Sequence, residues 1–376
     1  MILEKQRVVI GMIDGFGLDY LQSSPMPVLQ SMRAAGLFRK VNAVFPTVTN
    51  TNNVSICCGA WPEEHGITGN SYFNEATGNA DYMEDAAFIL RPTILERAGA
   101  AGAGIALLTC KEKTIRLLSK GATLALAAEN PAPEFIRRFG SPPPIYSREI
   151  NYWLWTVAVD ILSRRSDIRL LYVHTTDFPM HMWPPEAQES RVHLANLDAL
   201  LGEARETAPD AAFLLTADHG MNYKRRCWDL KKACAERGLE LRFALSAEKD
   251  RYVRHHRTFG GAAWVWLKSA GDLEQAAEMI SALEGVERVF TRGEAAKLFH
   301  LMPARIGDLI VLGDRETVFG ELPSASETLD SSYRSHGSLH ESDVPLLVYN
   351  AAVDLPPPNR FRFNFDLTRI PFGASA

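Results

Sequence analysis

The fold of this chain is indicated first by residues 8–15, which read VVIGMIDG. A continuous apolar run of this length, closed by an Asp-Gly pair, is typical of a buried parallel strand followed by a tight turn. Two later runs have the same form, residues 168–177 (IRLLYVHTTD) and residues 211–219 (AAFLLTADH). An acidic residue follows the last apolar stretch in all three, so each predicted strand delivers a carboxylate near its carboxyl end.

Amphipathic segments alternate with these runs along the chain. Helices are predicted over residues 27–35, 92–101, 151–165 and 186–204, and a further strand over 104–110. This alternation indicates an α/β fold with a mostly parallel, doubly wound sheet. Ligands of such sheets bind beyond the carboxyl ends of the strands, which is where the carboxylates fall.

Residues 224–323 differ in character from the rest of the chain. Basic runs are followed by a strand-like segment at 262–267, a helix at 273–283, a strand at 286–290 and a hairpin-like segment at 308–319. This order predicts a smaller α+β cap domain inserted into a catalytic core formed by residues 1–223 and 324–376.

Composition limits the classes of function. The chain has 376 residues, 46% of them hydrophobic and 23% charged, with a formal net charge of −5. We expect no nucleic-acid partner, because there is no broad basic field, and no membrane partner, because no apolar run could span a bilayer. Five cysteines without a CxxC pair, together with an N-terminus that lacks a signal-peptide pattern, predict a cytoplasmic location. The oligomeric state stays open.

A stretch rich in threonine and asparagine, residues 45–55, reads FPTVTNTNNVS. It offers a nucleophilic hydroxyl, amide donors and a helix start whose N–H groups attract negative charge. The alternative is a turn that only caps a helix. The positions of the Asp and His residues elsewhere favour the site over the cap.

Three carboxylates and three imidazoles are expected to converge at the sheet edge: Asp14, Asp177, His181, Asp218, His219 and His336. Each alone could be a turn residue or a structural histidine. As a set they suit zinc, with manganese or iron as possible substitutes. Together with the Thr49 oxygen they could bind two ions about 3.5–4 Å apart, an arrangement of many phosphoryl-transfer sites.

Five motifs along the chain form a recognisable series: the strand before Asp14-Gly15, Phe45-Pro46-Thr47-Val48-Thr49, Asp177-x-x-x-His181, Asp218-His219-Gly220-Met221 and His336-Gly337. This series resembles the alkaline phosphatase superfamily, and more narrowly its phosphodiesterase/nucleotide pyrophosphatase-like branch, which includes phosphonoacetate hydrolases. Lys111-x-Lys113 and the inserted segment resemble the latter group. Thr51 departs from the pattern, because relatives often have proline there.

The resemblance implies a division of roles among these residues. It implies that Asp177, His181 and His336 bind one zinc ion, and that Asp14, Asp218 and His219 bind the other. Thr49 would be the nucleophile and would contact the second ion. Substrate recognition would fall to Asn70, Lys111 and Lys113.

The implied function is a dizinc hydrolase that cleaves the C–P bond of phosphonoacetate, a small anionic phosphonate, to acetate and phosphate through a phosphothreonine intermediate. The two lysines would stabilise the enediolate that develops as carbon leaves. The alternative on the same scaffold is a phosphodiesterase or nucleotide pyrophosphatase. A third possibility is a non-catalytic binding protein.

Other polar residues have more than one interpretation. The lysines could be a solvated pair at a helix start, and the amides of Asn52 or Asn53 could stabilise phosphoryl oxygens. His65 and Asp85 are as compatible with a structural role as with a functional one. A structural role is favoured for His255 and His256, and His174 is expected to contact a ligand residue rather than an ion.

Overall fold

The computed structural model describes residues 2–251 and 257–373, and its largest part is built around a seven-stranded sheet. The strand order is β2 (Leu37–Asn42), β18 (Asp343–Tyr349), β8 (Ala212–Thr216), β1 (Val8–Met12), β7 (Ile168–His174), β5 (Gly104–Thr109) and β6 (Leu124–Ala127). The five strands from β8 to β6 pair in parallel, and β18 is antiparallel to both of its neighbours. The predicted mostly parallel α/β sheet is therefore confirmed.

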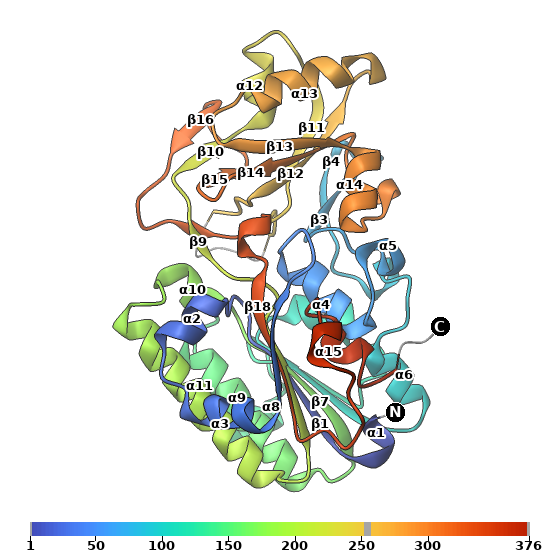
Figure 1. Cartoon of the computed structure of the whole chain (residues 1–376), viewed down its shortest axis with the longest axis vertical. Coiled ribbons are helices and arrows are strands. Elements are labelled where there is room, and N and C mark those ends of the chain that lie inside the picture. Colours follow the sequence, from blue (N-terminus) through green and yellow to red (C-terminus); the bar gives the residue numbers. More distant parts are fainter. Residues whose placement is uncertain (1, 252–256, 374–376) are drawn as a thin grey trace.

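Helices cover both faces of this sheet (Figure 1). On one face lie α3 (Pro27–Ala35), α9 (Glu149–Arg164) and α11 (Gln188–Thr207), and on the other α4 (Thr49–Cys58), α6 (Ile94–Ala100) and α15 (Asp366–Arg369). Every residue of β1 and β8 is buried. A strand covered on both faces has no solvated side, which explains the uninterrupted apolar runs in the sequence.

The predicted helix at residues 27–35 has the boundaries of α3. Pro27 suits the first helical turn because its missing N–H needs no partner there, and the helix ends before Gly36. The carboxylate of Asp198 on α11 accepts hydrogen bonds from the N–H groups of Val28 and Leu29 (2.9 and 2.8 Å). The remaining helices and strands of this part are α1 (Ile2–Lys5), α2 (Leu18–Ser23), α5 (Pro62–His65), α7 (Glu112–Leu118), α8 (Pro133–Phe139), α10 (Phe178–Met182), β3 (Ser71–Asn74) and β4 (Asn79–Tyr82).

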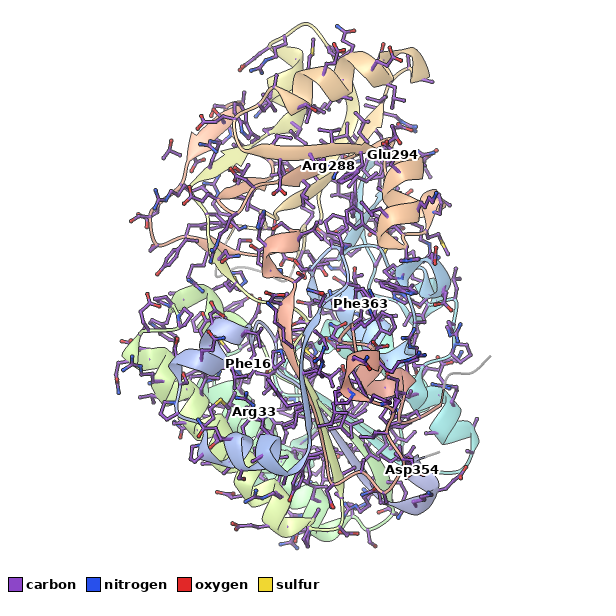
Figure 2. The ribbon with its side chains drawn as sticks, viewed as in Figure 1. Phe16, Arg33, Arg288, Glu294, Asp354 and Phe363 are labelled. Carbon is purple, nitrogen blue, oxygen red and sulfur yellow. The ribbon has the colours of Figure 1, made fainter. Side chains whose placement is uncertain are left out.

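A second, smaller unit lies above the sheet in the view of Figure 1. Its main sheet is antiparallel, in the order β11 (Leu241–Ser246), β12 (Ala262–Leu267), β14 (Leu309–Gly313) and β13 (Val286–Thr291). Helices α12 (Leu230–Ala235), α13 (Leu273–Ser281) and α14 (Arg292–Phe299) pack against it. Figure 2 shows Arg288 and Glu294 on this unit, and Phe16 and Arg33 on the larger one.

The hairpin predicted at residues 308–319 is wrong. Strand β14 is paired with β12 on one side and β13 on the other, so neither of its edges is open to the residues that follow it. Strand β15 (Thr317–Phe319) pairs instead with β10 (Arg226–Trp228), whose other neighbour is β16 (Ser326–Thr328). The boundary at residue 323 stays a prediction, and β16 lies just beyond it.

The chain passes between the two units along two segments that pair with each other. Strand β9 (Asn222–Tyr223) is antiparallel to β17 (Arg334–Ser335). Beside this pair, the buried Lys224 ammonium donates to the Glu341 carboxylate (2.9 Å). The two passages are therefore fixed to each other by backbone pairing and by a buried ion pair.

No helix within residues 2–251 and 257–373 is long and apolar enough to cross a membrane. The longest, α11, has 20 residues but a polar exposed side. The cytoplasmic location and the expected lack of nucleic-acid and membrane partners stay predictions.

Candidate metal centre and active site

Three neighbouring strands end at the same edge of the large sheet. Met12 at the end of β1 is level with His174 on β7 and with Thr216 on β8. Asp14, Asp177 and Asp218 follow these three positions by two or three residues. Parallel pairing thus brings the three acidic residues together, as the strand pattern predicted.

Asp14 and Asp218 each have one oxygen bound to the protein and one that faces the centre. Oδ1 of Asp218 accepts from the backbone N–H groups of Gly15 and His219, both at 3.0 Å. Oδ2 of Asp14 lies 3.3 Å from Nε2 of His174. The other two oxygens, Asp14 Oδ1 and Asp218 Oδ2, each lie 3.5 Å from Nε2 of His219. One potential ion site is therefore formed by Asp14, Asp218 and His219.

Gly15 permits this arrangement because its φ is +74°. A side chain there would be strained, and its Cβ would come within 3.3 Å of Cβ of Asp177. The tight turn after β1 thus allows the N–H of Gly15 to reach Asp218 while Asp177 packs alongside.

A second group adjoins the first and consists of Asp177, His219 and His336, whose ligand atoms lie within 4.8 Å of one another. Nε2 of His336 is 3.9 Å from Oδ2 of Asp177, and Nε2 of His181 is 2.8 Å from the same oxygen. The rings of His219 and His336 stack with centroids 3.5 Å apart. All six predicted ligands therefore lie together, and His219 is within reach of both groups.

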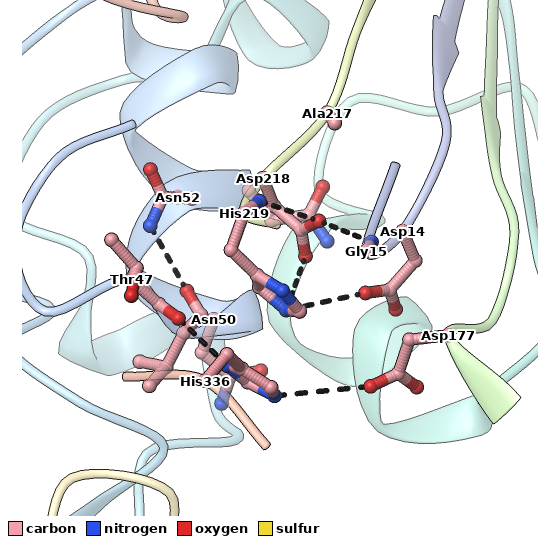
Figure 3. A network of polar contacts seen from close by, with 12 residues as sticks. Asp14, Gly15, Thr47, Asn50, Asn52, Asp177, Ala217, Asp218, His219 and His336 are labelled. Carbon is pink, nitrogen blue, oxygen red and sulfur yellow. Dashed lines mark hydrogen bonds and ion pairs between the residues drawn. The ribbon is translucent and has the colours of Figure 1, made fainter. Parts of the chain in front are cut away.

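The three imidazoles are oriented in the same way. Each Nδ1 lies at hydrogen-bond distance from a backbone carbonyl oxygen: His181 to Arg334 (2.9 Å), His219 to Gly220 (2.9 Å) and His336 to Thr47 (2.7 Å). Such a carbonyl fixes the proton on Nδ1 and leaves the Nε2 lone pair for a cation. Figure 3 shows the rings of His219 and His336 facing Asp14 and Asp177.

Four buried atoms at the centre lack a hydrogen-bond partner within the described part of the chain: Asp14 Oδ1, Asp218 Oδ2, His219 Nε2 and His336 Nε2. Burial and the neighbouring Asp14 raise the pKa of Asp218 well above its usual value. Burial lowers the pKa of His219 to about 3, with His336 adding to the effect, so this imidazole is neutral. Carboxylate oxygens and imidazole Nε2 atoms that are buried without a protein partner are the donor atoms that a divalent cation takes, so the residues fit the implied metal.

Helix α4 begins at Thr49, beside this cluster. Thr47, two residues earlier, accepts from His336 through its carbonyl and donates from its hydroxyl to the carbonyl of Ser338 (2.7 Å). Thr49 is 3% exposed. The segment before α4 is therefore bound directly to a residue of the metal cluster, two residues before the candidate nucleophile.

The side-chain amide nitrogens of Asn52 and Asn53 are already engaged with other protein groups, so the prediction that they stabilise phosphoryl oxygens is wrong. The amide nitrogen of Asn52 lies 3.1–3.2 Å from the carbonyl oxygens of Val44, Pro46 and Val48. Asn53 contacts His174 (3.0 Å) and accepts from the Tyr172 hydroxyl (2.6 Å). Asn52 holds the loop before α4 in place, because one amide nitrogen can donate to several backbone carbonyls.

Lys111 and Lys113 are buried, at 7% and 2% exposure, so the interpretation as a solvated pair is wrong. Nζ of Lys111 lies 3.2 Å from Oδ1 of Asp177 and 3.8 Å from Oδ2 of Asp14. Burial opposes its charge, but these carboxylates outweigh it and raise the pKa of Lys111. Lys111 therefore borders the metal cluster directly, and Lys113, two residues later, is paired with Asp250.

Asn70 links the start of α4 to the smaller unit. Its Oδ1 accepts from the N–H of Asn50 (3.1 Å), and its Nδ2 donates to Oε2 of Glu248 (3.1 Å). Oε1 of Glu248 lies 3.5 Å from Nε2 of His336. Sequence reasoning missed Glu248 and Asp250, because no strand was predicted before them and they enter the site only through tertiary packing.

The other candidates have defined places. His65 bridges the Ser55 hydroxyl (2.8 Å) and the N–H of Ile67 (3.1 Å), and Asp85 accepts from the N–H of Ala87 (2.8 Å). Both contacts are local and structural. His174 contacts Asp14, as expected for a residue that orients a ligand. His255 and His256 lie outside the described residues.

Comparisons with known proteins agree with this arrangement. The crystal structure of phosphonoacetate hydrolase from Sinorhizobium meliloti 1021 in complex with phosphonoacetate superposes with a TM-score of 0.86. It is 29% identical, and the match covers 96% of this chain and 94% of that one. Murine ectonucleotide pyrophosphatase / phosphodiesterase 5 shares the fold, with a TM-score of 0.70, 18% identity and coverage of 96% and 93%.

Curated relatives match shorter segments. Venom phosphodiesterase of Macrovipera lebetinus is 26% identical over 229 residues, which cover 58% of this chain and 26% of that protein. The chain thus spans about a quarter of the length of this relative. The type I phosphodiesterase / nucleotide pyrophosphatase family model matches residues 8–339, most of the chain. The protein is a member of the type I phosphodiesterase / nucleotide pyrophosphatase family.

Proposed function

We propose that this protein is a metal-dependent hydrolase that cleaves the C–P bond of phosphonoacetate to acetate and phosphate. The observation that carries the proposal is the buried Lys111 ammonium, which lies against two of six clustered potential metal ligands and two residues from the buried Lys113. The structural similarity to a phosphonoacetate hydrolase over nearly the whole chain supports it. The core, residues 1–223 and 324–376, would supply the ligands and nucleophile, and residues 224–323 would form the cap.

The ligands divide into two sets in this proposal. Asp14, Asp218 and His219 would hold one zinc ion and Asp177, His181 and His336 the other, with manganese or iron as possible substitutes. Bound ions would neutralise the phosphoryl oxygens and activate the Thr49 hydroxyl. The close approach of His219 to both groups supports two adjacent ions rather than two independent sites.

Thr49 would attack phosphorus in line with the C–P bond. The bond to carbon breaks as the Thr49 oxygen bonds to phosphorus, which gives a phosphothreonine, and the departing carbon takes up a proton to form acetate. Water then cleaves the phosphothreonine and releases phosphate. The N-terminus of α4, where Thr49 lies, favours the negative charge of the transferred group.

The leaving carbon bears the negative charge until it is protonated, and its carboxylate can delocalise that charge as an enediolate. Lys111 and Lys113 would stabilise this developing charge more than the ground state. Their burial supports this role, because an ammonium group interacts more strongly with an anion when water is excluded.

A phosphodiesterase or nucleotide pyrophosphatase is the second candidate, favoured by the family match over residues 8–339. Phosphate release from phosphonoacetate, set beside nitrophenol release from a nitrophenyl nucleotide ester, separates the two. We expect faster turnover of phosphonoacetate by the zinc-loaded protein. Preference for the ester with phosphonoacetate inert would refute the C–P assignment. Zinc well below one equivalent, with no activity on metal addition, would favour a non-catalytic binding protein.

A further inference from the structure

A short segment of the smaller unit, residues 247–250, places two carboxylates at the edge of the active site. It directly follows β11, and Glu248 and Asp250 are 2% and 5% exposed. Neither residue belongs to the predicted ligand set. Buried carboxylates need a partner, and their partners show what this segment does.

Asp250 is paired with Lys113, and both side chains are 2% exposed. Asp250 also lies close enough to Lys111 to favour the charge of that ammonium, after Asp177 and Asp14. The lysine pair therefore faces three carboxylates. Asp14 and Asp177 belong to the proposed metal ligands, so Asp250 is the carboxylate that remains with the lysines when ions are bound.

The position of Asp250 is fixed by contacts on both sides of the segment. Ala247 N–H donates to the carbonyl of Ala262 on β12 (3.0 Å), and the amide of Asn70 donates to Glu248. The Ser71 hydroxyl donates to the carbonyl of Lys249. The segment is thus bound to the cap sheet and to residues of the core, and Asp250 lies where these contacts hold it.

We propose that Asp250 is a specificity-determining residue that competes with the carboxylate of the substrate for Lys113. This inference rests on the proposed function of the lysine pair. A phosphonate with a carboxylate on its leaving carbon meets an ammonium that already has a carboxylate partner. A phosphonate without that carboxylate does not engage the lysines, so Asp250 leaves its binding unchanged. Asp250 therefore lowers the affinity of the site for phosphonates that carry a carboxylate on the leaving carbon.

The test compares binding of two phosphonates by calorimetry to the zinc-loaded full chain carrying Thr49→Ala, so that phosphonoacetate is bound without being turned over. Phosphonoacetate and methylphosphonate share the phosphoryl group and differ in the carboxylate. For Asp250→Asn we expect the Kd of phosphonoacetate to fall by about tenfold, the effect of one opposing charge in a partly dehydrated site. The Kd of methylphosphonate should stay within about twofold. Asp250→Glu keeps the charge, so it should not tighten the binding of phosphonoacetate.

Two results would overturn the inference. Unchanged or weaker binding of phosphonoacetate to Asp250→Asn would mean that Asp250 positions Lys113 rather than competing for it. If thermal melts show that both Asp250→Asn and Asp250→Ser are unfolded, the carboxylate at position 250 is needed for folding. Asp250 would then have a structural role and not one in specificity. Because the readout is binding, a wild-type protein that binds phosphonoacetate without cleaving it would refute the proposed function and leave this inference standing.

Discussion

The metal side and the lysine side of the site are built in different ways. On the metal side, the acidic residues follow adjacent strands of one sheet, and each imidazole is oriented by a backbone carbonyl. On the lysine side, Lys113 on α7 pairs with Asp250, which is 137 positions away and belongs to the other unit. Sheet topology therefore gathers the candidate metal ligands, whereas in the proposed reaction the packing of one unit on the other would decide which leaving groups fit.

Loss of the nucleophile should have the largest effect on activity, and the effect should be the same for substrates with and without a carboxylate on the leaving group. We expect Thr49→Ala to lower kcat on the order of 10⁴-fold for both phosphonoacetate and a nitrophenyl ester, because no hydroxyl is left to attack phosphorus. Steady-state kinetics with zinc content measured in parallel would test this. Thr49→Ser, which keeps the hydroxyl, is the matched control. Thr49→Ala with a tenth of wild-type activity would exclude Thr49 as nucleophile.

The next largest effect should come from the ion pair that joins the two passages between the units. Lys224→Met leaves Glu341 buried without its cation, and we expect a loss of about 3–5 kcal/mol in the free energy of unfolding. Urea denaturation would measure it. Lys231→Met, in the same unit and exposed, is the control. A loss below about 1 kcal/mol would mean that the remaining hydrogen bonds of Glu341 hold the junction.

The same pair has a defined pH dependence. Burial opposes the charge of Glu341, but Lys224 and its hydrogen-bond donors outweigh it and lower the pKa to about 2. Because this folded-state pKa lies below the unfolded value of about 4.3, the stabilisation is complete above pH about 4.3 and is lost as the pH falls towards 2. The difference between wild type and Lys224→Met should therefore shrink below pH about 4.

Lysine substitutions should separate the two sides. We expect Lys111→Ala or Lys113→Ala to lower kcat/KM for phosphonoacetate on the order of 10²-fold, because charge on the leaving carbon loses its stabilisation. Ester hydrolysis should change far less, since its leaving group gains nothing from the lysines. Lys120→Ala, at an exposed position, is the control. Equal losses on both substrates would refute the proposed role, and zinc content would show whether Lys111 also supports the ions.

The sequence predicted the metal side of the site better than the lysine side. The strands that end at Asp14, Asp177 and Asp218 were predicted because buried parallel strands have apolar runs that stop abruptly. The helix at residues 27–35 was predicted to the residue, since Pro27 and Gly36 mark its ends. Local patterns of this kind predict the helices and strands and the edge of the sheet at which the parallel strands end.

The failures concern pairings between distant segments. Residues 308–319 have a hairpin-like pattern, but β12 and β13 already occupy both edges of β14. The amides of Asn52 and Asn53 could serve a substrate or the backbone, and only the folded loop showed that the backbone takes the amide of Asn52. Glu248 and Asp250 gave no signal, because an acidic residue outside a recognised motif is usually a solvated one.

The smallest expected effect concerns Thr51, in the first turn of α4. Its hydroxyl is fully buried and has no hydrogen-bond partner within the described residues. Thr51→Val keeps the shape and removes the buried polar group, so we expect a gain of about 1 kcal/mol in the free energy of unfolding, read as a higher midpoint in urea. Thr51→Ala also loses the methyl group and should show no gain. A loss of stability in Thr51→Val would mean that the hydroxyl has a partner such as a bound water. The start of α4 would then depend on solvent for its order, unlike the candidate metal ligands, which hydrogen bonds within the protein hold in place.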